Sequence, residues 1–406
     1  MIIRARMIVP MEGDPIENGA VSVEGNRIVS LGRFDEVKAD HGADVRDLGD
    51  QILLPGLING HCHLDYTMLR GKIPPQQSFN DWIGEINTHK KTLQPEDYLS
   101  AIAAGFAEAK SFGTTTIVNL EAFPELLPRL DRPQLRTWWC AEMIDIRQPV
   151  SLPELSQNLR AWSESHPDLL GGIGLCPHAP FTASAQLYAE AGAIARIRDW
   201  LLTTHLAESR EEMQAFRDAN GSLFEFLQSI GRPMDDCGRE TPLSFLLRRH
   251  LIDQRWIVAH LNELTESDFD LLAQSEKFHI AHCPRSHTFL GHAPFALRKL
   301  RDLGFNICLG TDSLASNSSL SLFSEMRELL RKEPWISSRE VLEMATINGA
   351  RAIGRGDSLG KIRAGFTADM ISIPYAPGEM DVCATIVAFE GTVPWIMVDG
   401  EVLSPP

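Results

Sequence analysis

The sequence predicts an α/β protein, a (β/α)8 TIM-type barrel with a small β-sandwich built from both termini. Three observations support this prediction. Apolar strand-like runs alternate with helix-like stretches eight times over about 300 residues, and many of these runs end in polar residues. Short alternating runs separated by turn residues occupy both ends of the chain. Repeated strand–helix units build a parallel sheet with right-handed crossovers, and eight of them suit a closed barrel.

The eight predicted barrel strands lie between residues 52 and 312. In order, they are ILLPGLINGHCHL, TTTIVNL, LRTWWCAEMID, GGIGLCPHAP, WLLTTHLAE, RWIVAHL, FHIAHCP and FNICLGTD. Helical stretches follow the runs, with the first ones starting near Ala122, Leu152 and Ser184. A doubly wound open sheet is the alternative, but the first strand is not followed by a glycine-rich phosphate loop.

The two ends of the chain read as short strands. AVSVEGNRIVSLG forms two alternating runs around Gly25, which predicts a hairpin, and ADMISIP and PWIMVDGEVL give similar runs near the C-terminus. Neither end is large enough to bury a core alone. We therefore expect residues 1–54 and 364–406 to pair into one small sandwich and residues 55–363 to form the barrel. Two unrelated appendages are the alternative.

Composition limits the partners and the compartment. The 406 residues carry a formal net charge of −16, which argues against nucleic acid and against an anionic membrane surface as partners. The expected partner is a small-molecule substrate. The seven cysteines are scattered, which predicts a reducing cytoplasm and not a disulfide framework. The N-terminal residues resemble neither a signal peptide nor a membrane span. The sequence leaves the oligomeric state open, and a homo-oligomer is compatible with it.

His61 and His63 in the stretch PGLINGHCHLD give the first indication of chemistry. Residues i and i+2 of a strand point to the same face, so both imidazoles can reach one point beyond the strand's end. Two converging neutral imidazoles form half of a site for a divalent transition metal. Further polar residues end the later strands, namely His178, His205, Glu208, His260, His282 and Asp312. Barrel enzymes gather their chemistry at these C-terminal strand ends.

The motifs PGLINGHCHLD, PHAPFT, HLAES, IVAHL, HCPRSH and LGTDSLASN, in this order, resemble the amidohydrolase superfamily in its metal-dependent deaminase branch. The resemblance covers nearly the whole chain. It implies one divalent metal, zinc or alternatively ferrous iron, held by His61, His63, His205 and Asp312. Lysine is absent between Lys110 and Lys277, so the carboxylated lysine that bridges two metals elsewhere in this superfamily has no counterpart on the fourth strand.

The resemblance also implies the catalytic groups. Glu208 follows His205 by three residues, and a carboxylate beside a metal-bound water can take its proton and pass it to a ring nitrogen. The alternative is that Glu208 only begins the next helix, where its negative charge interacts favourably with the helix dipole. His260 would stabilise the attacking hydroxide, and Asp312 would help to move the second proton toward the leaving ammonia.

Substrate contacts are expected from several loops. His178 in PHAPFT matches a substrate-contacting histidine of the family, and Asp81-Trp82 in SFNDWI lies where relatives that deaminate adenosine-like compounds carry an acid followed by Trp. Ser78 with Asp81 also fits a helix-capping pattern, so the acid has two interpretations. Arg136 or Arg147, near the third strand, could meet a substrate carboxylate.

The segment HCPRSHTFLGH departs from the family pattern and resembles a subgroup related to aminodeoxyfutalosine deaminases. Arg285 could bind the carboxylate of such a substrate. The resemblance therefore implies a hydrolytic deaminase of an adenosine-like nucleoside, with aminodeoxyfutalosine as a candidate. The alternative activity is hydrolysis of another C–N or C–halogen bond on a nitrogen heterocycle, of guanine or triazine type. A non-catalytic barrel is the other class, but every expected metal ligand is present in the sequence.

Overall fold

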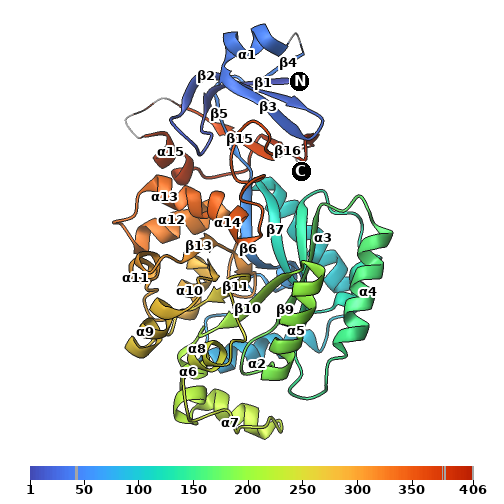
Figure 1. Cartoon of the computed structure of the whole chain (residues 1–406), viewed down its shortest axis with the longest axis vertical. Coiled ribbons are helices and arrows are strands. Elements are labelled where there is room, and N and C mark those ends of the chain that lie inside the picture. The colour runs from blue at the N-terminus through green and yellow to red at the C-terminus, as the bar shows by residue number, and fades with distance from the viewer. Residues whose placement is uncertain (42–43, 377, 379–380, 405–406) are drawn as a thin grey trace.

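The computed structural model describes residues 1–41, 44–376, 378 and 381–404, and within them the strands form two sheets (Figure 1). Neighbouring strands of the larger sheet are parallel. They are β6 (Leu57–His63), β7 (Thr114–Glu121), β8 (Arg136–Met143), β9 (Gly171–Pro177), β10 (Leu201–Leu206), β11 (Trp256–His260), β12 (His279–His282) and β13 (Asn306–Leu309). Shortly after β13, β14 (Asp312–Ser313) pairs with β6. The last strand thus closes on the first, and the predicted (β/α)8 barrel is confirmed.

The smaller sheet joins both ends of the chain. Its strands are β1 (Ile2–Ile8), β2 (Ile16–Glu24), β3 (Arg27–Arg33), β4 (Val45–Asp47), β5 (Gln51–Pro55), β15 (Met370–Pro374), β16 (Trp395–Val398) and β17 (Glu401–Leu403). The predicted hairpin around Gly25 is present as β2 and β3, with Gly25 at φ 56°. The two ends meet where β5 pairs with β15, with Leu54 opposite Ile371.

The chain changes sheets at Gly56. The first predicted barrel run began at Ile52, but residues 52–54 belong to β5 of the smaller sheet, and the barrel strand starts at Leu57. The amide of Gly56 donates to the carbonyl of Asp369 at 3.0 Å. A Cβ at this position would lie 2.2 Å from the side chain of Thr115, so the crossing needs glycine.

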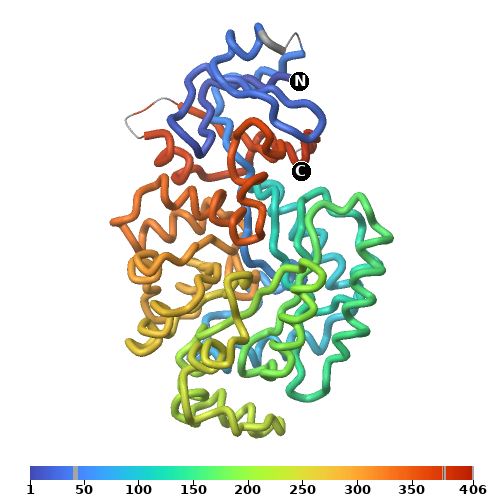
Figure 2. The backbone as a smooth tube through the Cα atoms, viewed as in Figure 1, coloured from blue at the N-terminus to red at the C-terminus, as the bar shows by residue number. Residues whose placement is uncertain are grey.

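Most helices surround the barrel, but the first in chain order packs instead on β1, β2 and β3 of the smaller sheet (Figure 1). The helices are α1 (Phe34–His41), α2 (Phe79–Lys90), α3 (Pro95–Ser111), α4 (Leu152–Ser165), α5 (Ala185–Arg198), α6 (Arg210–Asp218), α7 (Ser222–Ser229), α8 (Pro242–Arg248), α9 (Glu266–Gln274), α10 (Pro284–Leu290), α11 (Leu297–Asp302), α12 (Leu322–Lys332), α13 (Ser338–Met344), α14 (Ile347–Ala352) and α15 (Val382–Ala388). Figure 2 shows both termini in the blue and red sheet at one end of the molecule, and the segment of α7 at the other. Among the described residues, none of the helices combines the length and the apolar character needed to cross a bilayer.

The helix predicted from Ala122 is instead a short 3-10 helix, η2 (Pro124–Arg129). Pro124 starts it, where an α-helix would tolerate proline, but Pro128 lies inside it and removes a backbone donor that an α-helix would use. A second 3-10 helix, η1 (Leu64–Leu69), follows β6 directly.

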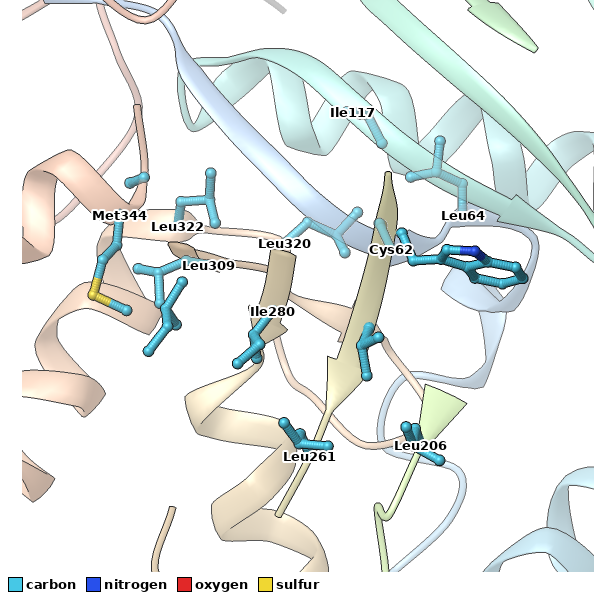
Figure 3. Packing of buried hydrophobic residues seen from close by; sticks show 14 of the residues in the cluster. Cys62, Leu64, Ile117, Leu206, Leu261, Ile280, Leu309, Leu320, Leu322 and Met344 are labelled. Atoms are coloured by element: carbon cyan, nitrogen blue, oxygen red, sulfur yellow. The ribbon is translucent and has the colours of Figure 1, made fainter. Parts of the chain in front are cut away.

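The core fixes which side chains of each strand face the barrel interior. Cys62 on β6 and Leu206 on β10 are fully buried in a hydrophobic cluster with Ile280 and Leu309 (Figure 3). Burying a leucine side chain contributes about 1.5–3 kcal/mol, so a one-residue slip of a strand would be costly. Because neighbouring residues of a strand point to opposite faces, this packing directs the histidines next to Cys62 and Leu206 to the opposite face.

Candidate metal and active site

Three histidines from β6 and β10 converge at the C-terminal ends of these strands. The ligand atoms of His61, His63 and His205 lie within 4.8 Å of one another, and Nε2 of His63 is 3.2 Å from Nε2 of His205. Nδ1 of His205 donates to the carbonyl of His178 at 2.8 Å, so its Nε2 keeps a free lone pair. Both ring nitrogens of His61 are buried without a hydrogen-bond partner among the described residues.

Asp312 completes this cluster from β14. Its Oδ1 lies 3.7 Å from Nε2 of His61 and 3.8 Å from Nε2 of His63. Its other oxygen, Oδ2, accepts hydrogen bonds from Ser286 Oγ at 2.6 Å and from Ser316 Oγ at 3.0 Å. Asp312 has a φ of 57°, a left-handed conformation that is uncommon outside glycine and clusters at functional sites.

The protonation of these groups suits a metal ion. Burial lowers the pKa of His205 to about 3, helped by the neighbouring His178, and burial also lowers the pKa of His63 well below its usual value. Burial opposes ionisation of Asp312, yet the adjacent imidazoles hold its pKa well below the usual range. Neutral imidazoles with free lone pairs and an ionised carboxylate form the donor set of a mononuclear transition-metal site. The ligand roles themselves remain predictions.

Glu208 lies beside this cluster, just after β10. Its Oε1 is 3.7 Å from Nε2 of His260, which ends β11. The backbone amide of Glu208 donates to the carboxylate of Glu212 at 2.8 Å, which holds the segment in place. Burial, together with the carboxylates of Asp312 and Glu212, raises the pKa of Glu208 well above its usual value. A buried carboxylate with a raised pKa is suited to exchange protons near neutral pH.

A cavity of about 980 Å³ opens over these groups. Its floor contains His63, His205, Glu208, His260 and Asp312. Its walls are mainly apolar, and a large part of them comes from helices α2 and α7, at the end of the molecule opposite the smaller sheet (Figure 1). The wall residues include Phe79, Trp82, Ile83, Ile86, Leu223, Phe226, Leu227 and Ile230. This volume lies at the upper end of the range for small-molecule sites, which favours a substrate larger than a single heterocycle.

His178 lines this cavity as the sequence suggests. Four charged residues that also line it were not predicted, namely Lys90, Lys91, Glu125 and Glu142. Nδ1 of His178 contacts Thr182 Oγ1 at 2.6 Å, and its Nε2 is 3.9 Å from Oε1 of Glu142. Glu142 is the second-last residue of β8 and lines the cavity, so its place near a strand end could have been read from WCAEM. Lys90 of α2 also lines the cavity and donates to the hydroxyl of Tyr66 at 2.8 Å. Nothing in the sequence around Lys90 distinguishes it from a surface lysine.

The structure separates the predicted pair Asp81-Trp82. Trp82 is buried, lines the cavity and donates from Nε1 to the carbonyl of Ala315 at 3.3 Å. Asp81 is exposed and is absent from the cavity wall. Its amide donates to Ser78 Oγ at 3.1 Å, and the Ser78 hydroxyl donates back to its carboxylate at 2.8 Å. Asp81 therefore lies in the first turn of α2, in a capping arrangement with Ser78, and the structure gives no support to its predicted substrate contact.

Only one of the three candidate arginines lines the cavity. Arg147, after β8, is exposed at the cavity wall. Arg136 begins β8, at the opposite end of the barrel, and pairs with Asp369 and Asp399 at 3.1 and 2.9 Å. The guanidinium of Arg285 turns away to Ser318. Arg136 and Arg285 are absent from the cavity lining and have protein partners outside it, so the structure gives no support to the predicted substrate contacts of these two residues.

Comparison with known proteins identifies the family. Residues 52–403 match the model of the Amidohydrolase family. The chain belongs to the amidohydrolase family. A 5-methylthioadenosine/S-adenosylhomocysteine deaminase of Moorella thermoacetica is 29% identical to this amidohydrolase, over 99% of this chain and 94% of that protein.

Solved structures share the fold of this amidohydrolase. An aminofutalosine deaminase of Helicobacter pylori, in complex with methylthio-coformycin, superposes with a TM-score of 0.86 at 21% identity, covering 99% of this chain and 100% of that one. A zinc-bound adenosine deaminase of Xanthomonas campestris gives a TM-score of 0.83 at 24% identity, covering 99% and 92%. At this identity, the likeness concerns the fold alone.

Proposed function

We propose that this amidohydrolase is a hydrolytic deaminase of an adenosine-like nucleoside, which replaces the exocyclic amine at C6 by oxygen and releases ammonia. The observation that carries the proposal is the position of Glu208, beside the cluster of histidines and Asp312 on the floor of a large cavity. The sequence relative described above is named as a deaminase of two adenosine derivatives, which supports the same reaction.

His61, His63, His205 and Asp312 would hold one divalent metal, for which we propose zinc, with ferrous iron as the alternative. Such an ion, when bound, acidifies a water molecule and so provides a nucleophile at neutral pH. The protein's own contribution is the donor set, the apolar surroundings and the hydroxyls of Ser286 and Ser316, which fix the orientation of the Asp312 carboxylate.

Proton transfer would depend on the residues around Glu208. The Glu208 carboxylate takes a proton from the attacking water and delivers it to the adjacent ring nitrogen of the purine. His260 faces the same position and donates a hydrogen bond to the oxygen that attacks C6. Asp312 helps to move the second proton toward the amine, which then leaves as ammonia. The overall reaction consumes one water and needs no other reactant.

Substrate recognition would use the walls of the cavity. His178 and Trp82 would contact the base, and the apolar faces of α2 and α7 would accept a 5′ substituent. A carboxylate on this substituent, as in aminodeoxyfutalosine, could reach Arg147. A desolvated, charge-assisted hydrogen bond of this kind contributes about 1.5–3 kcal/mol.

We further propose that the chain has two domains, one made of residues 1–54 together with 364–406 and the other of residues 55–363. The proposed enzyme acts in the cytoplasm, and both a monomer and a homo-oligomer are compatible with the proposal.

A substrate panel read by ammonia release tests the proposal. Adenosine, 5′-deoxyadenosine, methylthioadenosine and aminodeoxyfutalosine should be deaminated, and the extended nucleosides should be better substrates than adenosine. Guanine, also read by ammonia release, and a chlorinated triazine, read by chloride release, represent the alternative activities, and a higher kcat/KM with either would overturn the proposal. Arg147→Met should weaken turnover of the carboxylated nucleoside selectively, whereas Arg285→Met should leave the ratio between substrates unchanged.

A further inference from the structure

Two histidines of the segment after β12 converge on Glu208. Nδ1 of His287 lies 3.0 Å from Oδ1 of Asn262, and Nδ2 of Asn262 donates to the backbone carbonyl of Glu208 at 3.0 Å. Nε2 of His292 lies 3.9 Å from Oε1 of Glu208. One histidine thus supports the backbone of Glu208 through Asn262, and the other faces its carboxylate directly.

The local fold directs His292 toward the site. Helix α10 ends at Leu290, and Gly291, at φ 68°, reverses the chain in a left-handed turn. The amide of His292 then donates to the carbonyl of His287 at 3.3 Å. The ring of Phe79, at the start of α2, lies 6.1 Å from the His292 ring. The His292 side chain is only 5% exposed, so the arrangement is enclosed by protein.

The nitrogen that faces Glu208 is buried and has no hydrogen-bond partner among the described residues. Burial lowers the pKa of His292 to about 3, so its imidazole is neutral at physiological pH. When Glu208 is ionised, as a base must be, its carboxylate can only accept, so a neutral imidazole beside it is stable with its proton on Nε2. Catalytic hydrogen bonds are often long in a site without substrate and tighten in the reacting complex. The 3.9 Å contact between His292 and Glu208 is of the kind that can shorten to a hydrogen bond in this way.

We propose that His292 is a positioning residue that donates an Nε2–H hydrogen bond to Oε1 of Glu208 during the reaction. This inference rests on the proposed function, in which Glu208 is the base. The bond would hold the carboxylate toward the reacting atoms. His260, the other imidazole next to Oε1, would then be free to face the attacking oxygen. His292 itself would not touch the substrate's reacting atoms.

Paired variants test this role. His292→Leu removes the donor, and kcat should fall about tenfold to a hundredfold, as expected for one hydrogen bond to a charged group, with KM within about twofold. His292→Gln carries an amide donor near the position of Nε2 and should recover most of the loss. The control is His250→Ala, which removes an exposed histidine after α8 and should leave kcat unchanged. Metal content should equal that of the unmodified protein in all three.

The inference is overturned if His292→Leu keeps full kcat, if it changes only KM, or if His292→Gln is as slow as His292→Leu while both variants melt like the unmodified protein. A crystal structure of the metal-loaded protein with a bound nucleoside analogue gives a second readout. The distance from Nε2 to Oε1 should be below about 3.2 Å, and a value above about 3.5 Å would contradict the hydrogen bond. If no nucleoside releases ammonia, the proposed function fails, and this distance alone decides the role of His292.

Discussion

The hydroxyl of Ser286 donates a 2.6 Å hydrogen bond to Oδ2 of Asp312. Both side chains are buried, and Ser286 comes from α10, which follows β12, whereas Asp312 comes from β14. The bond leaves Oδ1 of Asp312 directed at His61 and His63. The orientation of one proposed metal ligand thus depends on a residue from a different strand–helix unit.

Ser286→Ala should therefore weaken metal binding. Partners that orient a ligand are typically worth about 10–100-fold in metal affinity, and Ser316 retains one hydrogen bond to the same oxygen. A chelator-competition titration measures the change. Ser318→Ala, on the exposed part of the neighbouring loop, is the control and should bind metal normally. Unchanged affinity of the Ser286 variant would show that Ser316 alone orients the carboxylate.

The protein as purified should carry about one divalent ion per chain, since the four proposed ligands lie around a single point. Asp312→Asn and His61→Asn should each lower the metal content and abolish turnover while circular dichroism still reports a folded barrel. Elemental analysis of the purified protein and of both variants gives the stoichiometry. Two tightly bound ions per chain would contradict the mononuclear site.

Glu208→Gln should retain the metal and lose activity. The amide keeps the size of the side chain but cannot take a proton, so kcat should fall by about 10²–10⁴. Steady-state kinetics with metal-matched preparations measure the loss. Glu211→Gln, on the first turn of α6, is a matched substitution three residues along the chain and should change kcat far less. A loss below about tenfold in the Glu208 variant would assign the base to another residue.

The pH dependence of kcat/KM should report the raised pKa of Glu208. The base must be ionised to act, so activity should fall as pH decreases through this pKa. Because burial and nearby carboxylates raise the pKa, the fall should occur at a higher pH than the value of about 4.3 for an ordinary glutamate. The pKa of His205 is lowered to about 3, so protonation of this proposed ligand would reduce kcat/KM only at a lower pH. A profile that stays flat down to about pH 4.3 would contradict this assignment.

Arg136→Met should destabilise the fold without affecting the cavity. The guanidinium is 12% exposed and pairs with Asp369 and Asp399 of the C-terminal part of the chain. Removing one partner of a buried ion pair costs about 3–5 kcal/mol, because the remaining carboxylates lose their counter-charge. Urea unfolding measures the loss in the free energy of unfolding. Arg132→Met, whose side chain is 61% exposed, should unfold at nearly the normal urea concentration.

The barrel and the convergence of its histidines could be predicted from the sequence because both follow from strand periodicity. His61 and His63 share a face, and parallel strands bring their C-terminal ends to one edge. The same rule places Arg136 at the N-terminal end of its strand, away from the site, and Glu142 near the C-terminal end, beside the site. Asp81 and Arg285 lie on loops or helix starts, where side-chain direction depends on partners such as Ser78 and Ser318 that no periodicity reveals.

The pairing of β5 with β15 has a consequence for synthesis of the chain. Leu54 and its partner Ile371 are separated by almost the entire barrel, so β5 leaves the ribosome long before β15 exists. At synthesis rates of about 5–20 residues per second, the apolar strand Ile52–Leu54 waits on the order of tens of seconds with one edge unpaired. An edge of this kind invites pairing with other chains. The nascent protein is thus most exposed to misassembly in the interval before its last strands are made.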